Sequence, residues 1–368
     1  MAGQITHIIA GERALREAAP EEGEELLREQ GPAFRLGCQG PDIFYHNQRT
    51  KPSGLHYGAL AHRRGYGRLV AGALASLPPE PSPARRQAEA YILGLATHAA
   101  LDRATHPFIV YFSGWHDPAI PGSERYRSCH PFLERLLDVG YLAASLGLPP
   151  AAFDIAAKLG LETGSTPESL GLPKDRAGEA LIVALWSSGL RSAFPRSTGS
   201  DFLLEKRVEN ALLDGRHFYG ITNPAVTALN PERKDWFGYL DDRAGPRSVC
   251  LVYPDSLPEG LDVLNLGKAA WEEPSGLGTE RDESYLELVE KGIHTAAVAL
   301  GALLPALATE GPPGFELAAA IGDGGLSIVD AEGRSVGPRV CRPLPLMEIM
   351  ELEYGRRLEW AKRQLGKA

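Results

Sequence analysis

The order of apolar and polar residues along the chain has a mostly helical period. Apolar residues recur three or four positions apart over most of the sequence, whereas strict alternation is scarce. Proline and glycine interrupt the pattern: Pro78 and Pro79 end one periodic stretch, and Gly147 ends another. The pattern predicts helices over residues 11–28 (interrupted at Pro20), 57–77, 84–102, 132–146, 179–193, 201–213, 284–307 and 346–364.

Two stretches favour β-structure instead. Residues 248–253 form a short apolar run that is typical of a strand. Residues 317–340 contain turn signals, including the segment from Asp330 to Gly333, which suit a small hairpin. The Pro- and Gly-rich residues 309–314 between the last helices suit a linker or a long surface loop. We therefore expect an all-α, multi-helix fold with a small C-terminal β-hairpin element.

Length and composition bound the organisation of the chain. The sequence has 368 residues, 43% of them apolar and 23% charged, which is an ordinary globular composition. Length alone suggests two or three domains, but the helical pattern favours one helical domain over residues 1–308. Residues 309–368 would add the small β element and a terminal helix packed on that domain. No apolar run reaches 18 residues, so we expect no transmembrane segment.

Charge and cysteine usage narrow the partners and the compartment. The net charge of −9 argues against a stable nucleic-acid partner but not against a phosphate-bearing substrate held at a metal. The first 27 residues lack the apolar core of a secretory signal, unless a leader has already been removed. The four cysteines are widely spaced, which suits a reducing cytoplasm and argues against a thiolate zinc site. These features together predict a cytoplasmic protein.

The histidines are unevenly placed, and acidic residues accompany them. Eight of the ten histidines fall within the first 134 residues. His98 and Asp102 are four residues apart on a predicted helix, as are His130 and Glu134, so each pair shares one helix face. His106 follows Asp102 by another four residues, at or just past the expected helix end. Each pair can therefore direct an imidazole and a carboxylate at one metal ion.

Further candidate ligands precede these pairs. They are His7 and Asp42, with either His46 or His56 completing the set. Imidazole and carboxylate donors suit zinc, although such sites also accept manganese or iron. Two ions held a few ångströms apart can bind a phosphate and activate a water molecule. A single His–Asp pair could equally be an ordinary helix-surface pair, so the prediction of a metal site rests on the conjunction of motifs.

The order of these motifs resembles that of the zinc-dependent phospholipase C family. The likeness is nearest to an intracellular-looking bacterial branch of it, and the single-strand-specific fungal nucleases are more distant cousins. The segments that carry the resemblance are ITHIIAG, LGCQGPDIFYH, SGLHYG, AYILGLATHAALDRATHPF and CHPFLERLLD, with LNLGKAAWEEPSG as a weaker later match. It covers most of residues 5–300. In the family, the spacing between the aspartate and the histidine that follows it favours His56 over His46 as the metal ligand after Asp42.

The resemblance implies a helical fold with metal ions in a cleft, and it divides the candidate ligands among three sites. One zinc ion would be held by Asp42, His56, His98 and Asp102. A second would be held by His106, His130 and Glu134. His7 would belong to a third site, to which Asp102 bridges. Asp42 would also act as general base toward the attacking water.

The expected function is zinc-dependent hydrolysis of a phosphodiester, of the phospholipase C type, with two zinc ions and room for a third. A nuclease-like or small-molecule phosphoesterase is the alternative within enzymes. A non-catalytic metal-binding protein is the alternative outside them. No pattern in the sequence identifies the residues that bind the organic part of the substrate, the head group or the oligomeric state.

Overall fold

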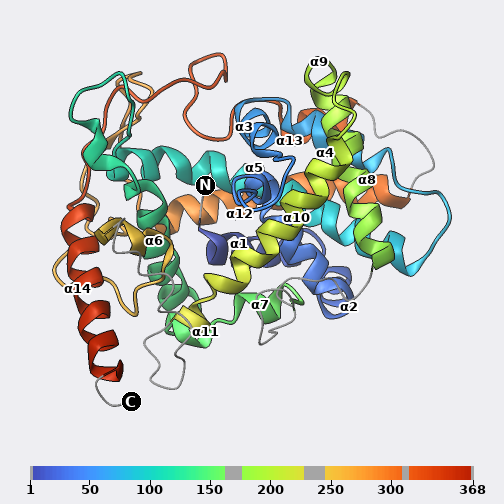
Figure 1. Cartoon of the computed structure of the whole chain (residues 1–368). Helices are drawn as coiled ribbons and strands as arrows, with labels where there is room; N and C mark the ends of the chain where they lie inside the picture. The colour runs from blue at the N-terminus through green and yellow to red at the C-terminus, as the bar shows by residue number, and fades with distance from the viewer. Residues whose placement is uncertain (1–2, 162–175, 228–244, 309–314, 366–368) are drawn as a thin grey trace.

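The chain is mostly helical, which confirms the expected all-α fold. A computed structural model describes residues 3–161, 176–227, 245–308 and 315–365 (Figure 1). The longer helices are α1 (Gln4–Ala18), α2 (Pro20–Cys38), α3 (Leu55–Arg63), α4 (Tyr66–Leu74), α5 (Pro83–Ser113), α6 (Cys129–Leu146), α8 (Arg176–Ala193), α10 (Leu204–Ile221), α12 (Tyr285–Ala308) and α14 (Leu346–Leu365). Short helical segments join them: η1 (Gly40–Phe44), η2 (Ser123–Tyr126), η3 (Pro150–Ala152), α7 (Ile155–Lys158), α9 (Pro195–Thr198), α11 (Pro224–Thr227), η5 (Gly245–Leu251) and α13 (Phe315–Ile321).

The long helix α5 lies near the middle of the molecule and packs against α2, α12, α8 and α6 (Figure 1). Two glycines bring the backbones of α2 and α5 into contact. A Cβ atom on Gly37 would lie 2.1 Å from the carbonyl oxygen of Tyr91, and one on Gly94 would lie 2.0 Å from that of Phe34. Because neither residue has a side chain, the two backbones can touch. The C-terminal end of α2 therefore lies against the middle of α5, near His98.

The buried apolar side chains form one continuous cluster. It extends from Ile5 on α1 to Met350 on α14 and includes Leu317, Ile321 and Leu326 from the C-terminal part of the chain. Within the described residues, α12 is the single helix that is long and apolar enough by composition to cross a membrane. Half of that stretch is buried, and it packs against α1 and α5.

Proline and glycine set several helix boundaries, although α2, α5 and α12 each contain an internal proline. Pro20 begins α2, and the stretch predicted over residues 57–77 divides into α3 and α4 at Gly65, whose φ is 75°. By contrast, α5 continues past the expected end at residue 102 and runs through Pro107 to Ser113. A proline inside a helix removes one backbone hydrogen bond but does not always end the helix when packing holds both halves. His106 is therefore well inside α5 rather than at its end.

The small β element is present, but it lies elsewhere than predicted. Strand β1 (Trp271–Glu272) pairs antiparallel with β2 (Glu280–Arg281), with Trp271 opposite Arg281. Residues 317–340 begin with α13 and contain one isolated bridge, between Val329 and Ser335, around the predicted turn. The expected linker at residues 309–314 lies outside the described residues.

The strand predicted over residues 248–253 is wrong. The chain there forms the helical turn η5, followed by an irregular segment. The buried residues in this stretch are Val249, Val252 and Tyr253, a spacing that cannot lie on one face of a strand.

Candidate metal centre

Histidine and carboxylate side chains from five elements converge around α5. The central group comprises five buried residues: His7 on α1, Asp42 on η1, His62 on α3, and His98 and Asp102 on α5. The outer group comprises His106 on α5 with His130 and Glu134 on α6. Within each of three sets of three residues, the ligand atoms lie within 4.8 Å of one another: His7, Asp42 and His98; His62, His98 and Asp102; and the outer group. These residues could hold metal ions.

In the central group, imidazole nitrogens face carboxylate oxygens. His62 Nε2 lies 3.0 Å from Asp42 Oδ1 and 3.7 Å from Asp102 Oδ2. His98 Nε2 lies 3.2 Å from Asp102 Oδ2, and His7 Nε2 lies 3.3 Å from Asp102 Oδ1. The rings of His7 and His98 are stacked, with centroids 4.3 Å apart. Asp102 is thus close to all three imidazoles.

The outer group adjoins the central one through Asp102. His106 Nδ1 lies 3.5 Å from Asp102 Oδ2, and His130 Nε2 lies 2.9 Å from Glu134 Oε1. The rings of His106 and His130 are nearly parallel, with centroids 5.6 Å apart. Because His98, Asp102 and His106 are four residues apart in turn on α5, one helix face supplies ligands to both groups.

Backbone carbonyls orient two of the three imidazoles in the central group. His62 Nδ1 lies 2.8 Å from the carbonyl oxygen of Gly58, and His98 Nδ1 lies 3.1 Å from that of Cys38. A neutral imidazole carries one N–H, and here it is donated at Nδ1, so Nε2 presents a lone pair to the group. This is the arrangement found around metal-binding histidines, in which the second nitrogen donates to an oxygen.

The donor atoms of the central group fit a cation. His7 Nε2, Asp42 Oδ1, His62 Nε2 and His98 Nε2 are buried and make no hydrogen bond. Buried lone pairs and carboxylates that face one another are costly unless a positive charge lies between them. Ligands about 2 Å from a tetrahedral zinc ion lie about 3.3 Å apart. The nitrogen–oxygen distances of 3.0, 3.2 and 3.3 Å match that spacing.

The pKa shifts reflect the same accumulation of negative charge. Burial lowers the pKa of His7, which favours its neutral, metal-binding form. Burial also lowers the pKa of His98, but the carboxylates of Asp102 and Asp42 outweigh it, and the net shift is upward. Burial opposes ionisation of Asp102, yet His98 holds the pKa of Asp102 well below its usual range. Asp102 is therefore ionised, and the site attracts a cation.

A buried carboxylate on α6 positions His7. Asp138 accepts hydrogen bonds from the backbone nitrogens of Ile5 and Thr6, at 3.1 and 2.8 Å, and from the Thr6 hydroxyl at 2.7 Å. The hydroxyl of Tyr253 donates to the same carboxylate at 3.0 Å. These bonds satisfy free N–H groups at the start of α1 and attach that helix to α6. His7 lies in the next position along α1 and is held against α5.

A tight turn after α2 positions Asp42. Gly40 has a φ of 56°, and a Cβ atom there would lie 2.3 Å from the ring of His98. Glycine tolerates both the left-handed conformation and the close approach to the ring. The short helix η1 begins at this glycine and carries Asp42 two residues later, directly beside His98.

The structure does not bring His56 into the centre, which corrects the expected ligand set. His56 is exposed on α3, where its ring adjoins that of Tyr57. The alternative ligand His46 is also outside both groups: its ring stacks on Phe218 at 3.7 Å, and burial lowers its pKa to about 3. His62 takes the position instead.

The phase of α3 explains this difference. His56 and His62 are six residues apart, which places them about 120° apart around a helix axis. The buried face of α3 includes Tyr57, Gly58 and Ala61, and His62 continues that face, whereas Leu55 and His56 are exposed. The spacing of the apolar residues Tyr57 and Ala61 was the sequence signal that could have found His62.

A pocket of about 570 Å³ adjoins both groups. Three of the metal-site histidines, His62, His106 and His130, line it. Its other walls comprise Tyr45, Ala59 and Arg63 near α3, Trp115 after α5, and Ser327, Ile328, Ser335, Val336, Gly337 and Pro338. The last six belong to residues 322–345, which we call the C-terminal wall. The backbone of this wall contacts the metal site, because His106 Nδ1 lies 3.1 Å from the carbonyl oxygen of Leu326.

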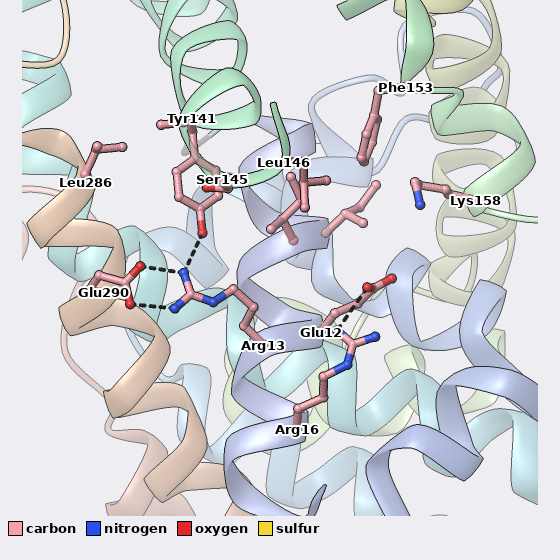
Figure 2. Close-up of a pocket in the computed structure, with 13 residues that line it drawn as sticks. Glu12, Arg13, Arg16, Tyr141, Ser145, Leu146, Phe153, Lys158, Leu286 and Glu290 are labelled. Atoms are coloured by element: carbon pink, nitrogen blue, oxygen red, sulfur yellow. Dashed lines mark hydrogen bonds and ion pairs between the residues drawn. The ribbon is translucent and has the colours of Figure 1, made fainter. Parts of the chain in front are cut away.

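A second hollow of about 360 Å³ lies between α1, α6 and α12 and is lined by none of the candidate ligands (Figure 2). Its two arginines pair with glutamates that also line it, and the ammonium of Lys158 lies over the ring of Phe153. Figure 2 shows Arg13 donating to both carboxylate oxygens of Glu290 and to the hydroxyl of Tyr141. Arg16 pairs with Glu12 one turn earlier on α1, at 3.3 Å. This hollow therefore offers no unpaired arginine charge to a ligand.

Comparison of the chain with protein-family models, with curated proteins and with solved structures finds no match. The interpretation of the centre consequently rests on its geometry and on its donor chemistry.

Proposed function

We propose that the protein is a metal-dependent hydrolase of phosphodiesters, of the phospholipase C type. The observation that supports this proposal best is the position of two adjoining ligand groups beside one pocket, which His62, His106 and His130 line directly. A purely structural metal site is normally closed by protein ligands, whereas a catalytic site keeps positions open to water and substrate. The order of the motifs, which resembles that of the zinc-dependent phospholipases C, supports the same function.

Two zinc ions per chain are the proposed complement. His62, His98, Asp42 and Asp102 would hold one, and His106, His130 and Glu134 would hold the other. His7 would belong to a third site, to which Asp102 would bridge, since Asp102 Oδ1 lies 3.3 Å from His7 Nε2. Zinc is proposed because imidazole and carboxylate together are its usual ligands in hydrolases.

Each residue would contribute a separate part of the reaction. Bound zinc would supply a Lewis acid for a phosphate oxygen and would lower the pKa of a water molecule. Asp42 would bind zinc through Oδ1, which is buried and makes no hydrogen bond, and would accept the proton of the attacking water at its other carboxylate oxygen. Asp102 would hold the ligand imidazoles in place, since it lies within 3.7 Å of His7, His62, His98 and His106.

The test is hydrolysis by the zinc-loaded protein of bis(p-nitrophenyl) phosphate, p-nitrophenylphosphorylcholine and single-stranded DNA. We expect turnover of at least one small diester, and a loss of about 100-fold or more in kcat for Asp42→Asn, the usual contribution of a general base. Glu209→Gln, an exposed change on α10, is the matched control and keeps full activity. If no diester is hydrolysed with zinc, manganese or iron, the chain is a non-catalytic metal-binding protein.

A further inference from the structure

The pocket beside the metal centre has a marked charge asymmetry. Its lining includes Arg63 and three histidines but no aspartate or glutamate. The nearby carboxylates belong to the two ligand groups, where they face imidazole nitrogens at 2.9–3.9 Å. A cationic group entering this pocket would meet the positive charge of Arg63 and no carboxylate in the lining.

Arg63 is the residue of this pocket that is available to an anion. It follows His62 at the end of α3 and is exposed. Among the described residues, no acidic side chain forms an ion pair with it, whereas Arg13 in the other hollow is bound by both oxygens of Glu290. An arginine that lines a pocket and has no carboxylate partner is well suited to bind a phosphate oxygen.

The remaining walls suit an uncharged organic group. Tyr45, Trp115, Ile328, Val336 and Pro338 supply apolar surface around the mouth. The ring of Tyr45 lies tilted against that of His62, with centroids 5.0 Å apart, so His62 already occupies one side of this ring. A cation would have to use the remaining aromatic surface in the presence of the Arg63 charge, which opposes a cation–π contact.

The chain holds Arg63 in this place through the C-terminal wall. The hydroxyl of Ser335 donates to the carbonyl oxygen of Arg63 at 3.0 Å. The backbone nitrogen of Leu326 donates to the carbonyl oxygen of His62 at 2.8 Å. The end of α3, which carries both a ligand and the arginine, is thereby fixed to the wall of the pocket.

We propose that Arg63 is a substrate-binding residue that pairs with an anionic oxygen of the phosphodiester. The pocket consequently selects diesters whose organic substituent carries no positive charge. The proposal rests on the phosphodiesterase function proposed above and names the class of substrate for it.

The experiment compares two diesters that release the same p-nitrophenol. Bis(p-nitrophenyl) phosphate has an uncharged aromatic substituent, and p-nitrophenylphosphorylcholine has a quaternary ammonium. The zinc-loaded wild type is expected to prefer the first by at least about tenfold in kcat/KM. Arg63→Gln should raise KM for it by about tenfold, the contribution of one hydrogen bond to a charged group. Arg63→Glu should shift the ratio of the two substrates toward the choline ester.

Arg64→Gln is the matched control. Arg64 is the next residue, is equally exposed and lies outside the pocket lining, so its loss should leave both KM values unchanged. Binding of phenylphosphonate, measured by calorimetry on the zinc-loaded protein, gives a readout that needs no turnover. We expect its affinity to fall about tenfold in Arg63→Gln, again the effect of one charged hydrogen bond, and not in Arg64→Gln.

Two results would overturn the proposal while leaving a phosphodiesterase intact. One is a wild type that cleaves the choline ester as well as, or better than, the aromatic diester. The other is an Arg63→Gln variant that matches Arg64→Gln in KM and in phenylphosphonate binding. Absence of turnover with both diesters would instead refute the phosphodiesterase itself, and phenylphosphonate binding would still decide whether Arg63 binds an anion.

Discussion

The two sides of the candidate active site are built in different ways. The side that could bind metal comes from the first 134 residues, and most of its candidate ligands lie on regular helices at spacings of four. The opposite side is the C-terminal wall, residues 322–345, which has one isolated bridge and no helix. Each ligand atom must be held within about 0.5 Å of the position that the metal requires, which packed helices achieve. A wall for an organic group needs shape rather than regular structure.

The wall nevertheless has a defined anchor. Arg103, which follows Asp102 on α5, donates to the carbonyl oxygens of Ile321, Gly322, Gly324 and Gly325 at 2.5–3.2 Å. Neighbouring residues on one helix thus serve the two sides separately: Asp102 serves the metal centre and Arg103 serves the wall. A substitution at Asp102 should therefore reduce metal binding, whereas a substitution at Arg103 should reduce substrate binding.

The largest effect is expected at the metal centre, from Asp102→Asn. The variant should lose zinc and reduce kcat/KM by more than about 100-fold, because even indirect supporters of metal ligands cost 10- to 100-fold. Zinc should raise the melting temperature of the wild type and not that of the variant. In the metal-free state at neutral pH the variant should be less stable than the wild type, because the lowered pKa of Asp102 means that folding favours its ionised form. Calorimetry with and without chelator checks both statements.

His62→Ala and His56→Ala form a pair that tests the corrected ligand. The first should lower zinc content by about one ion per chain and abolish most activity, since catalytic zinc sites use about three protein ligands. The second should keep both, because His56 is exposed and outside both groups. Elemental analysis of the two purified variants gives the answer. Equal zinc content in both would return His56 to consideration as a ligand.

At Arg103, the expected effect is smaller and of a different kind. Arg103→Gln should keep the zinc content of the wild type but raise KM, because the wall loses its bonds to α5. Its unfolding free energy should fall by about 1–3 kcal/mol, the cost of leaving partly buried carbonyl oxygens unpaired. Denaturant titration and zinc analysis together check this outcome. A loss of zinc would show that the wall and the metal centre are one unit rather than two.

The smallest effect concerns the turn within the wall and its dependence on pH. Hydrogen bonds from Arg334 lower the pKa of Asp330, so the ionised carboxylate stabilises the folded turn. This contribution is present above the unfolded pKa of about 4 and is lost as the pH falls through the lower folded value. Amide hydrogen-exchange protection at Glu332 and Arg334 should therefore be greater in wild type than in Asp330→Asn at pH 6. At pH 3 that difference should have narrowed, and an undiminished difference would contradict this role of the carboxylate.

The difference between the two sides also explains what the sequence could and could not predict. The pairs His98–Asp102 and His130–Glu134 could be inferred because a helix fixes the direction of residues four apart. His62 was missed because the spacing to Asp42 was given more weight than the phase of α3. The wall was missed because its residues show no period and meet the site only through long-range backbone contacts, such as that of Leu326 with His106.

The most direct test of the central claim is anomalous diffraction at the zinc edge from crystals of the zinc-loaded protein. We predict two peaks, one among His62, His98, Asp42 and Asp102 and one among His106, His130 and Glu134. A further, weaker peak beside His7 would agree with the same arrangement. No peak in these groups, or a zinc ion bound at His56, would contradict it.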